Sequence, residues 1–118
     1  MVAVDLNHDS QALIGEVQFD LMQKHAVFIN IARGSVVDEN ALIDALQQNK
    51  IFAAGLDVYA KEPLQSSALF ELANVVTAPH IGSATVETRK KMVDLAYQNL
   101  IDALEDRTPR YLVNPKFE

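Results

Sequence analysis

The feature that most constrains this chain is the alternation of short apolar runs with amphipathic helical patterns. Residues 26–31 (AVFINI) form a nearly continuous apolar run rich in β-branched side chains, and residues 53–58 (AAGLDV) form a second one. Between them, alanines and leucines recur at helical spacing over residues 41–46, behind Asp38, which is a favourable helix N-cap residue. Strands that alternate with helices are typical of βα units and a parallel sheet. The sequence therefore predicts an α/β fold.

Weaker patterns complete the expected order of elements. They predict a short helix within 15–24, a helical turn at 69–72, a strand at 74–77, a long helix that starts at Ser83 or Thr85 and stops before Pro109, and an irregular tail at 113–115. The run at 2–4 is ambiguous, so the sheet has three or four strands, which is few for an open α/β domain. We expect the strand at 26–31 to be buried on both faces, as in parallel sheets.

Composition narrows the possible partners. The formal net charge of −6 and the pI near 4.9 make nucleic acid and anionic membranes poor partners. The absence of cysteine excludes disulfides and thiolate metal sites, and no metal site is predicted from the spacing of His, Asp and Glu. With neither a signal-peptide pattern nor an apolar run of membrane-spanning length, the expected location is the cytoplasm.

The glycines set a limit on nucleotide binding. A Rossmann-type site uses a G-x-G-x-x-G turn so that backbone N–H groups can approach the pyrophosphate. The chain has only Gly15, Gly34, Gly55 and Gly82, and no two of them are close enough to build this turn. The residue that reads the ribose, about 20 positions after such a turn, is therefore not identifiable. The expected sheet resembles one half of a larger domain.

Three polar residues lie where open α/β sheets place their ligands, at the ends of expected strands: Arg33, Glu62 and His80. Arg33 follows the run at 26–31 directly, and Gly34 would let the chain turn away. A guanidinium at this place can bind a carboxylate or a polarised carbonyl in a bidentate manner. The alternative is that Arg33 only ends the strand and forms an ion pair with Asp38 or Glu39. Asp57 lies inside the second run, where a buried carboxylate needs a donor such as an amide, or else it faces solvent at the strand end.

Glu62 and His80 are the other candidates for chemistry. Each is unremarkable alone, because loop carboxylates and loop histidines are usually solvated. If the two side chains meet, the carboxylate favours the imidazolium and fixes the tautomer of the ring. Such a pair can donate and accept protons near neutral pH.

Three segments carry a resemblance to a known family. Residues 28–42 (FINIARGSVVDENAL), 54–63 (AGLDVYAKEP) and 77–85 (TAPHIGSAT) resemble the signatures of the D-isomer-specific 2-hydroxyacid dehydrogenases, in the family's order and with similar spacing. The resemblance extends from about residue 2 to the tail. Residues 83–85 and the helix at 99–104 are most similar to the branch of glyoxylate, hydroxypyruvate and 2-ketogluconate reductases.

The resemblance implies catalytic roles for three residues. Arg33 matches the arginine that binds the carboxylate and carbonyl of the substrate. His80 matches the acid/base that protonates the carbonyl oxygen while hydride arrives from the nicotinamide. Glu62 matches the partner that holds the imidazolium.

The resemblance also implies a cofactor, either NAD or NADP. Asp57 matches the position that contacts the nicotinamide carboxamide, and Ala32 and Gly82 line the same pocket with their backbone. Arg33 and His80 would border the nicotinamide as well. The choice between the two cofactors depends on the ribose-reading residue that the sequence does not show.

Taken as a whole, residues 1–118 are expected to form the C-terminal half of an NAD(P)-binding domain, a partial Rossmann-like parallel sheet, followed by a long C-terminal helix. The family's glycine-rich βαβ unit and its substrate domain are absent from this sequence. We therefore expect a fragment of a reductase of 2-keto acids such as glyoxylate or hydroxypyruvate, inactive alone, whose parent enzyme is a homodimer. The alternative is a non-catalytic α/β module that self-associates through exposed strand edges and helix faces.

Overall fold

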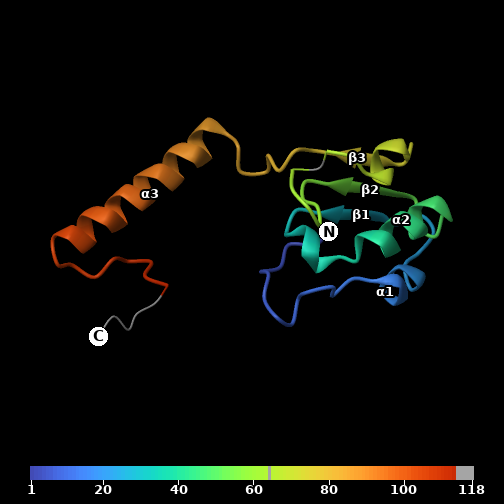
Figure 1. The fold of residues 1–118 in the computed structure, drawn as a ribbon, viewed down its shortest axis with the longest axis horizontal. Coiled ribbons are helices and arrows are strands. Elements are labelled where there is room, and N and C mark those ends of the chain that lie inside the picture. Colours follow the sequence, from blue (N-terminus) through green and yellow to red (C-terminus); the bar gives the residue numbers. More distant parts are fainter. Residues whose placement is uncertain (64, 114–118) are drawn as a thin grey trace. The chain divides into compact units, whose positions relative to one another are not determined.

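Three parallel strands form the centre of the first part of the chain (Figure 1). The computed structural model describes residues 1–63 and 65–113. The strands are β1 (Val27–Asn30), β2 (Ala53–Leu56) and β3 (Val75–Thr77), adjacent in the order β1-β2-β3. In the pairing register Asn30 lies opposite Leu56, and Leu56 lies opposite Thr77. The carboxyl ends of all three strands therefore reach the same edge of the sheet.

Two helices cover one face of this sheet. They are α1 (Glu16–Asp20) and α2 (Glu39–Gln47), and Asp38 caps α2 as predicted, its carboxylate accepting from the N–H groups of Asn40 and Ala41. Phe19 of α1 meets Phe28 of β1 edge to face, with ring centroids 5.2 Å apart. The buried core consists of Phe19, Phe28, Val36, Val37, Leu42, Ala45, Leu46, Ile51, Ala54, Leu56, Tyr59 and Leu69.

The prediction that residues 26–31 are buried on both faces is wrong for this structure. Along β1, Phe28 and Asn30 are buried, whereas Val27 and Ile29 are 53% and 37% exposed. The reason is that α1 and α2 pack on the same side of the sheet, and no described residue between 1 and 82 covers the other side. The run at 2–4 contributes only an isolated bridge, in which Val2 pairs with Asn30.

Short 3₁₀ turns replace some of the expected loops and helices. One is η1 (Gly34–Val36), directly after β1, and the other is η2 (Ala68–Glu71), at the position predicted for a helical turn. The first lies between β1 and α2, and the second lies just before β3 and packs against it.

The second unit, residues 83–118, contains α3 (Val86–Leu104), the long helix that the sequence predicts. It starts after Thr85, whose hydroxyl accepts from the N–H of Thr88. Within this unit, none of the described side chains of α3 is buried. Of the tail predicted at 113–115, residues 114 and 115 lie outside the described residues. Among the described residues, no helix is both long and apolar enough to span a membrane.

Candidate active site

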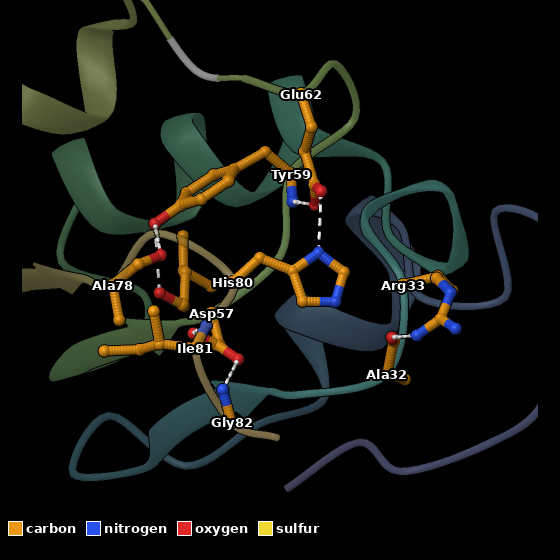
Figure 2. Close-up of polar contacts among 10 residues, drawn as sticks. Ala32, Arg33, Asp57, Tyr59, Glu62, Ala78, His80, Ile81 and Gly82 are labelled. Atoms are coloured by element: carbon orange, nitrogen blue, oxygen red, sulfur yellow. Dashed lines mark hydrogen bonds and ion pairs between the residues drawn. The ribbon is translucent and has the colours of Figure 1, made fainter. Parts of the chain in front are cut away.

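The three strand ends bring the predicted polar residues to one edge of the sheet (Figure 2). Arg33 follows β1, Asp57 follows β2 and His80 follows β3. Glu62 reaches the same place from the segment after β2. Sequence order separates these residues widely, and the parallel register is what gathers them.

Asn30 shapes the segment that carries Arg33. This side chain is 2% exposed, its amide nitrogen donates to the Arg33 carbonyl at 3.1 Å, and its amide oxygen accepts from the Ala32 N–H at 3.0 Å. Both polar ends of a buried amide are thus satisfied by the turn that follows the strand. Asn30 was not predicted as a site residue, although a polar residue near the end of an apolar run was a usable signal.

Gly34 is required for a different reason from the one that the sequence suggested. It does not adopt a positive φ, so a turn does not need a glycine here. Instead, a Cβ at this position would lie 1.8 Å from the carbonyl carbon of Tyr59 and 1.9 Å from its oxygen. The Arg33 segment and the segment after β2 therefore touch backbone to backbone, at a distance that no side chain permits.

Glu62 and His80 meet. The Nδ1 atom of His80 lies 2.7 Å from Oε2 of Glu62, and Oε1 of Glu62 accepts from the Tyr59 N–H at 3.0 Å. The side chains remain 43% and 35% exposed, so a small molecule can reach the ring. The hydrogen bond from His80 lowers the pKa of Glu62, and the Tyr59 N–H and the positive charge of Arg33 add to this effect. The carboxylate thus stays ionised while it holds the imidazole.

The lowered pKa of Glu62 is directly measurable. We expect its carboxyl group, followed by NMR, to titrate below the ordinary value near 4.5, and His80→Ala to raise the midpoint towards that value. Because the pKa is lower in the folded state, the stabilising contribution is complete above the unfolded-state pKa and is lost as pH falls through the folded-state pKa. His25→Ala is the control and should leave the midpoint unchanged. A Glu62 midpoint that does not respond to His80→Ala contradicts the contact.

Asp57 clamps the segment that carries His80. Its Oδ1 accepts from the Ile81 N–H and its Oδ2 from the Gly82 N–H, both at 2.8 Å. The predicted need for an amide donor is confirmed, and the donors are backbone amides. His80 itself has φ 54°, a left-handed conformation that costs a non-glycine residue about 1–3 kcal/mol unless its surroundings hold it. The clamp supplies part of that hold.

Replacing Asp57 by Asn tests the clamp. The amide presents an NH₂ group where one of the two backbone N–H groups now finds an oxygen, so one charge-assisted bond is lost and a donor faces a donor. We expect a loss of about 1–3 kcal/mol in the free energy of unfolding and faster hydrogen exchange at Ile81 or Gly82. Urea denaturation and NMR exchange measure the two effects. Asp9→Asn, at an exposed position, should change neither, and an unchanged Asp57→Asn protein argues against the clamp.

Arg33 lies on the side of the imidazole ring away from Glu62 in Figure 2. Its Nη1 donates to the carbonyl of Ala32 at 2.7 Å. The acidic residues proposed as alternative partners are engaged elsewhere, since Asp38 caps α2 and Oε2 of Glu39 accepts from the Ala60 N–H at 3.0 Å. The exposed guanidinium thus borders the same small region as the ring, and one of its nitrogens is already bonded.

A cavity of about 470 Å³ adjoins the Glu62–His80 pair. Its walls are mostly apolar and come from the segment after β2, from η2 and from the end of β3. The lining residues are Tyr59, Glu62, Pro63, Phe70, Thr77, Ala78, Pro79 and His80. Among the described residues, no cluster of His, Asp and Glu could hold a metal ion.

Comparison with known proteins identifies the family. Residues 1–82 match the family model described as the NAD binding domain of the D-isomer specific 2-hydroxyacid dehydrogenases. The chain belongs to this family. The matched part contains all three strands and every residue of the candidate site.

Relatives with known names agree with this assignment. The chain is 52% identical over 116 residues to glyoxylate/hydroxypyruvate reductase B of Salmonella newport, covering 98% of this chain and 36% of that protein. Among solved structures, it is similar to a glyoxylate/hydroxypyruvate reductase from Sinorhizobium meliloti in complex with NADP and malonate. The TM-score is 0.84 at 34% identity, and 95% of this chain and 38% of that chain are covered.

A third relative binds the other cofactor. The structure of D-lactate dehydrogenase with NAD⁺ from Lactobacillus jensenii matches with a TM-score of 0.82 at 30% identity, covering 93% of this chain and 37% of that chain. This chain of 118 residues thus spans little more than a third of the length of these relatives. Its similarity to them includes the residues that follow the matched domain.

Proposed function

We propose that this chain supplies the nicotinamide-side catalytic groups of an NAD(P)-dependent enzyme that reduces 2-keto acids, such as glyoxylate or hydroxypyruvate, to D-2-hydroxy acids. The observation that carries the proposal is the 2.7 Å contact between Nδ1 of His80 and Glu62, with the guanidinium of Arg33 beyond the ring. A proton donor and a carboxylate-binding cation stand together at an exposed edge of the sheet. Reduction of a 2-keto acid requires both.

Glu62 and His80 would act together on the proton. The Glu62 carboxylate bonds to Nδ1 and so leaves Nε2 to face the substrate. When it is protonated at both nitrogens, the ring donates the Nε2 proton to the carbonyl oxygen as that oxygen gains negative charge. In the reverse direction the neutral ring removes the hydroxyl proton from the same place.

Arg33 would orient the substrate. The guanidinium nitrogens other than Nη1 remain available to the carboxylate of a 2-keto acid, and a planar guanidinium binds that group in a defined orientation. The malonate in the Sinorhizobium meliloti reductase complex is a small dicarboxylate and supports a carboxylate site in this family. Held in this way, the substrate would direct the oxygen of its keto group towards Nε2 of His80, which protonates it.

The described residues fit the nicotinamide end of the cofactor. Each carboxylate oxygen of Asp57 uses one lone pair on a backbone amide and keeps another for a carboxamide N–H. Ala32 and Gly82 would border the ring with their backbone, between Arg33 and His80. When bound, the reduced nicotinamide supplies the hydride. NAD and NADP are equally compatible with these residues, because none of them reads the ribose.

A chimeric enzyme tests the proposal. In this chimera, the chain replaces the 36% of Salmonella glyoxylate/hydroxypyruvate reductase B that it matches. We expect the purified chimera to reduce glyoxylate with NADPH or NADH at a rate within about tenfold of the parent reductase, followed by loss of nicotinamide absorbance. A chimera that folds and binds the nucleotide but does not turn over would contradict the proposed roles.

The chain alone is expected to show little or no turnover. Its four glycines build no pyrophosphate turn, so the cofactor would be held at one end only. Nothing in the described residues closes over the site, and water would compete for the reacting groups. The assay uses purified chain with glyoxylate and NAD(P)H, and a rate comparable to an intact reductase contradicts this expectation.

Self-association is a second candidate property, favoured by the bare face of the sheet. Val27, Ile29, Phe52 and Val76 are exposed, and together with residues at the end of α2 they line one hollow. A contiguous apolar surface of this kind favours burial against another chain, and a homodimer is the simplest outcome. Size-exclusion chromatography with light scattering should give the mass of a dimer, and a stable monomer argues against it.

We place the full-length enzyme to which this chain belongs in the cytoplasm, which cell fractionation would check.

A further inference from the structure

The residue that connects the whole candidate site is Tyr59, to which the sequence analysis gave no role. It lies just beyond β2 and is 7% exposed. Its hydroxyl lies 2.8 Å from the carbonyl oxygen of Ala78 and 3.0 Å from that of Leu56. Its backbone N–H donates to Glu62. One side chain and its own peptide thus reach both the segment that carries Glu62 and the segment that carries His80.

The third segment also touches Tyr59. Gly34, the neighbour of Arg33, packs against the Tyr59 carbonyl so closely that a Cβ would overlap it. Tyr59 therefore contacts the Arg33 segment through its carbonyl, Glu62 through its N–H, and the His80 segment through its hydroxyl. Figure 2 shows the phenol reaching towards Ala78 while the Tyr59 N–H reaches Glu62.

The Ala78 carbonyl is the point at which the phenol acts on His80. That oxygen accepts from the Tyr59 hydroxyl and also from the His80 N–H at 3.1 Å. The Tyr59 hydroxyl thus fixes the orientation of the Ala78 peptide group, which lies two residues before His80 and its left-handed backbone. Asp57 holds the other side of His80 through Ile81 and Gly82. The histidine stands between two anchors, and one of them is the phenol.

The role requires that the Tyr59 hydroxyl stays protonated. Burial raises the pKa of Tyr59 above its ordinary value, and the carboxylates of Asp57 and Glu62 act in the same direction. The hydroxyl therefore keeps its proton and remains a donor. A buried tyrosine hydroxyl usually has such a partner.

We propose that Tyr59 is a positioning residue for the Glu62–His80 pair, whose hydroxyl orients the Ala78 peptide so that Nδ1 of His80 faces Glu62. This role rests on the proposed function, in which His80 is the proton donor. The contact itself does not depend on any reaction. It predicts a change in the His80 ring when the hydroxyl alone is removed.

Tyr59→Phe is a clean test of the hydroxyl. The Ala78 carbonyl retains the His80 N–H, and the Leu56 carbonyl retains the Ala78 N–H at 2.8 Å, so neither oxygen is left without a donor. The ring stays in the core, and the global fold should persist. Only the orientation of the Ala78 peptide loses its second constraint.

The experiment uses the 118-residue chain and ring-nitrogen NMR of His80. In Tyr59→Phe we expect the Nδ1–H signal at Glu62 to weaken, the ring to shift towards a mixture of tautomers, and exchange of the Ile81 and Gly82 amides to accelerate about fivefold. Tyr97→Phe, at an exposed position of α3, is the matched control and should change none of these signals.

Each outcome is decisive for Tyr59. Altered His80 signals in a protein that still unfolds cooperatively support the positioning role. Unchanged His80 signals overturn it, and so does a Tyr59→Phe chain that fails to fold, because the phenol would then serve the core as a whole. A failure of the glyoxylate assay would count against the proposed function and leave this measurement valid, since the ring signals require neither cofactor nor substrate.

Discussion

In the chimera, replacing His80 by Gln is expected to lower kcat for glyoxylate reduction by about 10²–10⁴-fold, the usual contribution of a positioned acid or base. Glutamine cannot supply a proton from a cationic ring, although it can still hydrogen-bond to Glu62. The carboxylate of the substrate would still find Arg33, so KM should change much less than kcat. Steady-state kinetics with NADPH measures both constants.

The matched control is His25→Gln in the same chimera. His25 is exposed in the turn before β1 and lies outside the candidate site. Its replacement should leave both kcat and KM within about twofold of the unaltered chimera, as is usual for surface substitutions. If His80→Gln retains more than a tenth of the turnover, His80 is not the acid of this reaction.

The second large effect is expected at Gly34. In Gly34→Ala, the new methyl group would lie 1.8 Å from the Tyr59 carbonyl carbon, and backbone atoms cannot move aside as a flexible side chain can. We expect a loss of about 3 kcal/mol or more in the free energy of unfolding. That is a large fraction of the roughly 5–15 kcal/mol of a typical domain. Urea denaturation of the 118-residue chain measures it.

Gly55→Ala provides the control for this effect. Gly55 lies inside β2, and a Cβ there would meet only the side chain of Ile29 at 3.8 Å, an ordinary contact. Its replacement should change stability by no more than about 1 kcal/mol, because the loss of unfolded-state entropy offsets small adjustments. Equal effects of the two substitutions would mean that the approach of Gly34 to Tyr59 is not as close as the structure has it.

The order of elements could be predicted because the spacing of apolar residues along the chain differs between helices and strands. The runs that became β1 and β2, the helix behind Asp38, and the long helix that became α3 all follow from it. The burial of β1 could not be predicted in the same way. An apolar side chain such as Val27 shows that a face can be buried, but not whether any residue covers it.

For the candidate site too, individual residues could be predicted from the sequence, but most of their contacts could not. Arg33 and His80 could be selected because they follow expected strands. Asp57 could be selected because a carboxylate inside an apolar run needs a donor, and that donor is present. The meeting of Glu62 with His80 could only be posed as a condition, since no spacing in the sequence fixes a contact across 18 positions. The hydroxyl of Tyr59 bonds to a backbone carbonyl 19 positions away. Because every residue has a backbone carbonyl, the sequence does not indicate which one accepts this bond.

The configuration of the glycerate that the chimera makes from hydroxypyruvate tests most directly whether this chain can serve a D-specific reductase. With Arg33 holding the carboxylate and His80 protonating the oxygen, the keto carbon presents one face to the nicotinamide, as expected of a D-isomer specific family. We predict D-glycerate, formed at a rate within about tenfold of that of the Salmonella reductase. Its formation should be lost in the His80→Gln chimera. L-glycerate, a racemic product, or turnover that survives the loss of His80 would contradict the proposed site.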